Sequence, residues 1–127
     1  MERLGRVEDI LEIQPVTSDN DPNGLLHREN GGYTACIYFT STGIESAGDS
    51  PVSRGTDGGG AVEVYSTVQD AEARCEYLRG FDNTILYTGS YAIVGTMVIR
   101  ISYAYTDEAQ YEMTDRIAKA FTQLETV

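Results

Sequence analysis

The segment from residue 19 to residue 24 has the side-chain chemistry of a calcium-binding loop. Its sequence places oxygen-bearing side chains at alternating positions before a glycine: Asp19-Asn20-Asp21-Pro22-Asn23-Gly24. Ca²⁺ prefers several hard oxygen ligands arranged around a tight turn. The twelfth position of the loop, however, is Asn30 rather than glutamate, and Pro22 interrupts the ligand run. Two interpretations are therefore open: a metal site of Asp19, Asp21 and Asn23, or a turn whose side chains bond nearby backbone amides.

The residues of a catalytic site are sparse in this chain. His27 is the single histidine, and a catalytic triad would need it beside a serine and a carboxylate. The segment Thr88-Gly89-Ser90-Tyr91 lacks the second glycine of a Gly-x-Ser-x-Gly nucleophile turn. Residues 55–60 are rich in glycine but lack the Lys-Ser/Thr ending of a phosphate-binding loop. The sequence therefore predicts a protein that is not an enzyme and that uses no cofactor.

The two cysteines, Cys36 and Cys75, are too few for a four-thiolate zinc site. Cys36 lies on an expected strand, and Cys75 lies on the apolar side of an expected helix. If that helix packs over the face of the strand that carries Cys36, a disulfide between them is possible. The other interpretation is a pair of buried free thiols, which behave as small apolar groups.

Tyrosine is the conspicuous aromatic residue, with nine copies against three phenylalanines and no tryptophan. A tyrosine ring with its polar tip suits a recognition surface, although it also suits half-exposed strand positions. We predict a binding surface formed by strand tyrosines and by polar residues of the 19–33 loop. Its candidate residues are Asp21, Asn23, Arg28, Tyr33, Tyr87, Tyr91 and Tyr103.

The formal charge is −11, from 20 acidic residues against nine basic ones. This balance argues against nucleic-acid binding and against docking on anionic lipid, because both need basic surface. It allows cations or basic partners. The length of 127 residues fits one domain over residues 1–127. No window reaches the ~20 apolar residues of a membrane-spanning helix.

Local sequence signals place the elements that must position these residues. Strands are expected at 33–40, 62–65, 85–93 and 97–105, with a tight hairpin turn at Gly95. Helices are expected from Ser66 or Thr67 to Gly80, and from Thr106 onward. Residues 41–60 predict an exposed flexible loop. Residues 5–13 fit a short helix that leads into a strand.

These elements predict an α+β fold of the order ββαββα. Its simplest form is an antiparallel four-stranded sheet with both helices on one face. The other face of the sheet would be at least partly open, which is where the strand tyrosines would be available to a partner.

One motif resembles a family of small lipoproteins of Gram-positive bacteria, whose pattern is Asp-Pro-Asn-x-Leu-Leu-Gly-Arg-Pro-Gly-x-Tyr-Thr. The corresponding segment here is Asp21-Pro22-Asn23-Gly24-Leu25-Leu26-His27-Arg28-Glu29-Asn30-Gly31-Gly32-Tyr33-Thr34. The resemblance extends over roughly residues 8–125. It includes the strand at 62–65, the helix that contains Asp70-Ala71, and the last helix, which Thr106 and Gln110-Tyr111 match loosely. The departures are His27, Glu29 and Asn30.

The resemblance implies export and residence on the extracellular face of the cell membrane of a Gram-positive bacterium. It also implies a lipid anchor on a cysteine upstream of this sequence, because Met1-Glu2-Arg3-Leu4 lacks the apolar run of an export signal. The family brings no catalytic residues. We therefore expect a binding module for a protein or cell-envelope partner. The alternative is a cytoplasmic structural or assembly subunit, with the open sheet face buried in a homodimer.

Overall fold

The computed structural model describes residues 10–17, 19–21, 26, 32–41, 44, 50–80, 89–102 and 104–122. Its five strands are β1 (Ile10–Pro15), β2 (Ala35–Ser41), β3 (Gly59–Val64), β4 (Gly89–Val94) and β5 (Met97–Ser102). Its two long helices are α3 (Val68–Arg79) and α4 (Asp107–Thr122). A short helix α2 (Pro51–Arg54) and a 3₁₀ turn η1 (Gly55–Gly58) precede β3.

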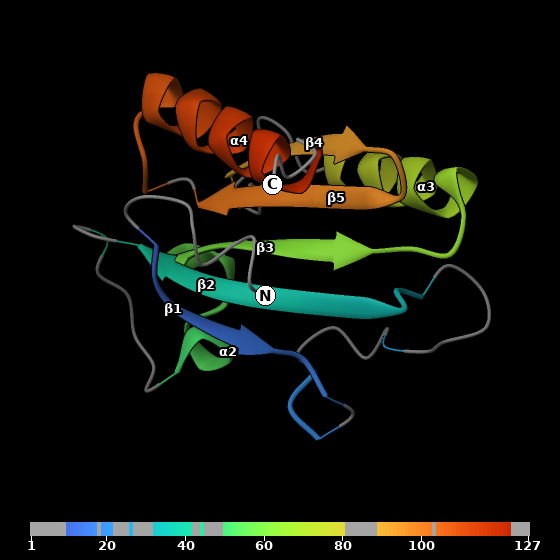
Figure 1. Ribbon diagram of the computed structural model, residues 1–127, viewed down its shortest axis with the longest axis horizontal. Helices are drawn as coiled ribbons and strands as arrows, with labels where there is room; N and C mark the ends of the chain where they lie inside the picture. The colour runs from blue at the N-terminus through green and yellow to red at the C-terminus, as the bar shows by residue number, and fades with distance from the viewer. Residues whose placement is uncertain are drawn as a thin grey trace, which may run out of the picture.

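The strands form a single antiparallel sheet in the order β1-β2-β3-β5-β4 (Figure 1). The central strand β3 pairs with β2 on one side and with β5 on the other. Strands β1 and β4 therefore form the two edges. The fold class is α+β, as the sequence predicts.

The two long helices pack on opposite faces of the sheet. Ala61 of β3 belongs to a buried cluster with Ala71, Cys75 and Leu78 of α3. The next residue, Val62, points the other way, into a second cluster that holds Met113 and Ile117 of α4. This alternation follows from the two-residue period of a strand.

The predicted four-stranded sheet with both helices on one face is therefore wrong in two respects. The segment 10–15 adds a fifth strand by pairing with β2, and the helices are divided between the faces. The alternation of β5 suggests one apolar face and one polar face, but Val98, Arg100 and Ser102 are buried like Ile99 and Ile101. The expected open face is covered by α3 and α2.

The local signals at the ends of the elements are confirmed. The Thr67 hydroxyl accepts a hydrogen bond from the Asp70 N–H at 3.1 Å at the start of α3. The Thr106 hydroxyl does the same for the Ala109 N–H at 3.2 Å before α4. Gly95 adopts φ +60 in the turn between β4 and β5, a conformation that glycine reaches at low cost.

Residues 51–60 differ from the predicted exposed loop over 41–60. Val52 is buried, and its N–H donates to the Gln14 side-chain oxygen at 2.9 Å. At Gly60 an added Cβ would lie 2.2 Å from the Arg100 carbonyl oxygen and 2.6 Å from a ring carbon of Phe39. Gly60 is required by close packing inside β3, whereas the sequence suggested flexibility. Residues 42–43 and 45–49 lie outside the described residues.

Candidate functional site

The 19–33 loop is joined to the interior of the fold through Asp21. The half-buried Asp21 carboxylate accepts hydrogen bonds from the Tyr33 hydroxyl and from the Leu26 N–H, the latter at 2.8 Å. The Tyr33 side chain is fully buried, so it supports the loop from inside and is not part of an exposed binding surface. Of the other predicted binding residues in this loop, Asn23 and Arg28 lie outside the described residues, as does His27.

The oxygen-rich turn forms local hydrogen bonds where it is described. The Asn20 side-chain oxygen accepts from the Thr17 N–H at 2.6 Å, a local bond from a side chain to the backbone three residues earlier. Asp19 is exposed. Within the described ranges, no three His, Cys, Asp or Glu side chains gather so that they could hold a metal ion. The third predicted ligand, Asn23, lies outside them.

The predicted tyrosine surface on an open sheet face is not formed by the described tyrosines of β2 and β3. Tyr38 and the residue after β3, Tyr65, are buried on the face that α2 and α3 cover. Tyr91 of β4 is half-buried against the same cluster. Tyr87 and Tyr103 lie outside the described residues. Of the named strand tyrosines, only Tyr91 is described near an edge of the sheet.

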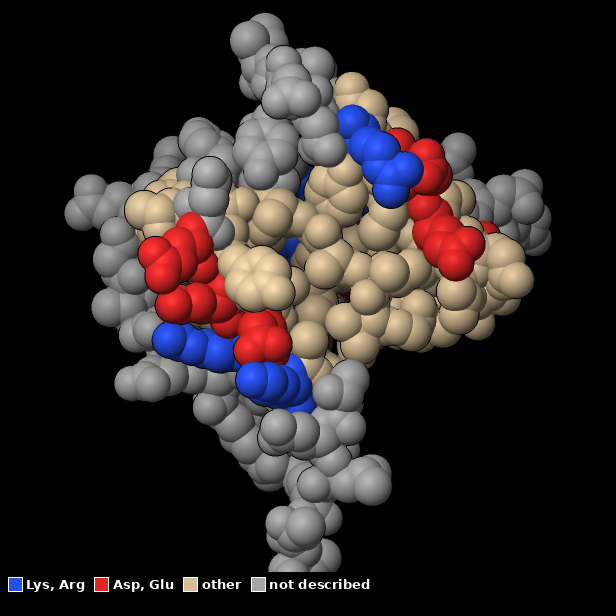
Figure 2. Space-filling view, turned by 90° about the horizontal axis from the view of Figure 1, so that it is seen from above, with Lys and Arg blue, Asp and Glu red and all other residues tan. Residues whose placement is uncertain are grey.

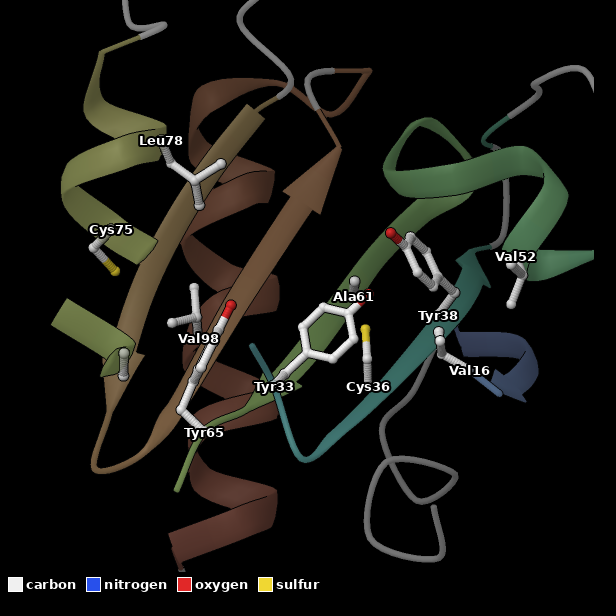
Figure 3. Packing of buried hydrophobic residues seen from close by; sticks show 11 residues of the cluster. Val16, Tyr33, Cys36, Tyr38, Val52, Ala61, Tyr65, Cys75, Leu78 and Val98 are labelled. Carbon is white, nitrogen blue, oxygen red and sulfur yellow. The ribbon is translucent and has the colours of Figure 1, made fainter. Parts of the chain in front are cut away.

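Cys36 and Cys75 point into the same buried layer, but both are free thiols (Figure 3). In this view Tyr33 and Tyr65 are drawn between the two side chains. Burial raises the pKa of the Cys36 thiol, and the nearby Glu63 charge raises it further. Burial also raises the pKa of Cys75. Both groups are therefore protonated thiols at neutral pH, and neither is an activated nucleophile.

The strongest concentration of polar chemistry is a buried ion-pair cluster around Glu63 of β3, which we call the Glu63 cluster. The Glu63 side chain is fully buried, and it accepts a hydrogen bond from the Tyr65 hydroxyl at 2.8 Å. Arg74 of α3 binds both carboxylate oxygens, through Nε at 3.0 Å and Nη2 at 3.2 Å. Arg100 of β5 approaches through Nη1 at 3.4 Å.

The electrostatics of the Glu63 cluster follow from its burial. Burial raises the pKa of Tyr65, and the charge of Glu63 and the hydrogen bond to it raise it further, so the phenol stays neutral. Burial acts to lower the pKa of Arg74, but the charge and hydrogen bonds of Glu63 outweigh it and hold the pKa above its ordinary value. The Arg74 guanidinium also lies 5.3 Å from the centre of the Tyr77 ring, a cation–π arrangement.

Both oxygens of Glu63 are thus occupied by donors, and no face of the carboxylate reaches solvent. A general base must be within reach of a substrate proton, and Glu63 does not meet that requirement in this arrangement. The cluster instead joins α3 to the centre of the sheet.

The positions of these residues indicate the cluster only once the strand register is known. Glu63 pairs with Val98 and Ala61 pairs with Arg100, so Glu63 and Arg100 are diagonal neighbours on one face, within reach of long side chains. Arg74 lies between Ala71 and Leu78 on the buried side of α3. Sequence reasoning missed Glu63 and Arg100 because an alternating strand normally directs its charged residues to water. It missed Arg74 because charged residues of a surface helix normally lie on its solvated face.

A second feature lies at the β4 edge of the sheet, which we define as strand β4 with its side chains Tyr91 and Ile93. Strand β4 contains no charged residue, and Ile93 is 41% exposed. Both long helices contact β4, one on each face. Seen from above the edge, charged side chains gather in two groups with an uncharged surface between them (Figure 2).

No protein-family model, curated protein or solved structure matches the chain. Neither the fold nor the sequence therefore brings an activity from another protein. In the part of the chain that the structure describes, no helix is both long and apolar enough to cross a membrane.

Proposed function

We propose that this chain is the non-enzymatic binding domain of an exported lipoprotein, and that it recognises a protein partner in the cell envelope through the β4 edge. Export and lipid anchoring are supported by the motif at residues 21–34. The strongly acidic composition supports a partner with basic surface.

The observation that carries the proposal is the uncharged strand at the border of the sheet. Among the strands that the structure describes, β4 pairs with β5 on one side and is the terminal strand of the sheet on the other. Soluble proteins usually protect such edges, because unpaired backbone groups invite another chain. An apolar edge with Ile93 exposed is therefore suited to a partner.

The state of the polar interior supports binding over catalysis. The carboxylate, phenol and guanidinium groups of the Glu63 cluster are bonded to one another away from solvent. The two cysteines are protonated, buried thiols. The most concentrated polar chemistry of the described residues thus serves the core, and the exposed apolar groups of the β4 edge remain for recognition.

The test is site-specific photocrosslinking in the bacterium that encodes the protein. Ile93 is replaced by p-benzoylphenylalanine, with the same replacement of Leu11 as the matched control, because Leu11 is 64% exposed on the opposite edge strand β1. We expect a discrete adduct from position 93 and none from position 11. Absence of an adduct at position 93, or equal adducts at both positions, would contradict the proposal.

A further inference from the structure

The two edges of the sheet are protected unequally. Edge strand β1 carries Glu12 and Pro15, and its register shifts between Ile10 and Glu12. Charge, proline and an irregular register are three features that prevent an edge from pairing with another chain. Strand β4 has none of them: its sequence is GSYAIV, and all six of its residues pair in register with β5.

From this contrast we infer that the partner is an extended peptide segment with Lys or Arg near its ends, which binds by adding a strand to β4. The inference rests on the proposed function and names the class of partner. Strand addition uses main-chain hydrogen bonds for affinity and alternate side chains for specificity. One face of the added strand would lie beside Tyr91 and Ile93, so apolar residues are expected at alternate positions there.

The charge of the partner follows from the surroundings of the edge. Figure 2 shows charged side chains on both sides of the uncharged surface. The basic groups of these helices are paired: Arg79 with Glu76, Arg116 with Glu112, and Lys119 with Asp115. Exposed Glu72 and Glu108 add further negative charge on α3 and α4. Two of the nine basic residues, Arg74 and Arg100, are buried on Glu63, so the surface is more acidic than the total charge suggests.

The same charges disfavour a second copy of this chain as the occupant. In a two-fold antiparallel pairing of two β4 strands, α3 of one copy would lie beside α3 of the other, and α4 beside α4. Like-charged surfaces would then be brought together, which costs free energy. A basic segment meets no such repulsion.

The experiment selects phage-displayed random dodecapeptides on the wild-type domain and then measures synthetic versions of the enriched peptides. We expect enriched sequences with alternating β-branched or aromatic residues and flanking Lys or Arg. Their binding should weaken as salt rises, and it should perturb the amide resonances of residues 89–94. Ile93→Lys, which adds the missing edge charge, should weaken binding about tenfold or more, whereas Leu11→Lys should leave it unchanged.

Spectra of the two lysine variants establish that each is folded before binding is compared. The inference is overturned if no such peptides are enriched, if Ile93→Lys and Leu11→Lys behave alike, or if the wild-type domain is a dimer whose β4 amides are protected. A specific crosslink at position 93 to a folded, non-extended surface would overturn the inference while leaving the proposed function intact. Loss of that crosslink altogether would contradict the proposed function itself.

Discussion

Replacing Glu63 with glutamine tests whether the Glu63 cluster holds α3 on the sheet. The change keeps the size of the side chain and removes its negative charge. Arg74 and Arg100 would stay where they are, with side chains only 10% and 9% exposed. Two buried guanidinium groups would then lose the carboxylate that both contact.

The expected cost is large because solvent cannot replace the lost charge. Removing one partner of a buried ion pair typically costs about 3–5 kcal/mol, whereas a whole domain is stable by about 5–15 kcal/mol. For a domain of this size, about 1 kcal/mol shifts Tm by roughly 4 °C. We therefore expect Glu63→Gln to lower Tm by roughly 12–20 °C.

The assay is thermal and urea unfolding followed by circular dichroism, with Asp115→Asn as the matched control. Asp115 pairs with Lys119 at 2.8 Å, but these side chains are 53% and 61% exposed, so the control should cost no more than about 1 kcal/mol. If Glu63→Gln costs no more than the control, the argument from burial is wrong.

A triple variant separates charge from packing. Replacing Glu63 with leucine and both Arg74 and Arg100 with methionine removes every charge of the cluster while filling similar volume. Such replacements are often neutral or stabilising. We expect the triple variant to be more stable than Glu63→Gln. A triple variant that is less stable than Glu63→Gln would show that the lost hydrogen bonds, and not the uncompensated charges, cause the destabilisation of Glu63→Gln.

Three further perturbations follow from the structure. Burial raises the pKa of Cys36 above its ordinary 9.0, so the folded thiol keeps its proton at a pH where the unfolded chain loses it. The contribution of this thiol to stability should be level below pH 9 and should fall above pH 9 by up to about 1.4 kcal/mol per pH unit. Urea unfolding across this range should show a shallower decline for Cys36→Ala, and an unchanged slope would refute the assignment. Gly60→Ala should cost about 3 kcal/mol or more, because its Cβ would overlap the Arg100 carbonyl oxygen, a backbone atom that cannot rotate away. Gly95→Ala meets no atom within 4 Å and should cost only about 1–2 kcal/mol for its positive φ. Thermal melts in which Gly60→Ala loses no more stability than Gly95→Ala would contradict the packing argument. Thr67→Ala should cost about 0.5–2 kcal/mol by removing the first-turn hydrogen bond of α3, and a thermal melt within error of wild type would exclude a stabilising role for that cap.

Features determined by neighbouring residues could be predicted from the sequence. The hydroxyl caps at Thr67 and Thr106 and the turn at Gly95 each depend on a few adjacent positions. The buried sides of the two long helices followed from helical periodicity at Ala71, Cys75, Leu78, Met113 and Ile117. Val68 shares the helical spacing of Ala71, Cys75 and Leu78, but it is 43% exposed because it lies in the first turn beside the cap.

Features that depend on distant partners could not be predicted in the same way. Glu63 looks like a solvent-facing strand residue until Arg74 and Arg100 are placed beside it. Gly60 looks flexible until Phe39 and the Arg100 backbone are seen to fill the space of its side chain. The division of the helices between the two faces could not be predicted, because Glu63 of β3 and Arg100 of β5 make one face of the sheet resemble a solvent-exposed surface in sequence.

The Glu63 cluster also affects how the β4 edge is presented. Arg74 ties α3 to Glu63 at the centre of the sheet. At the C-terminal end of α3, the charge of Glu76 and hydrogen bonds to Glu76 and to Tyr91 of β4 raise the pKa of Arg79. Helix α3 is thus held both at the sheet centre and at the edge strand. An edge that is ordered before the partner arrives costs less entropy on binding. A substitution at Glu63, remote from the proposed interface, should therefore weaken peptide binding at β4, whereas a substitution at exposed Glu12 on the opposite edge strand β1 should not.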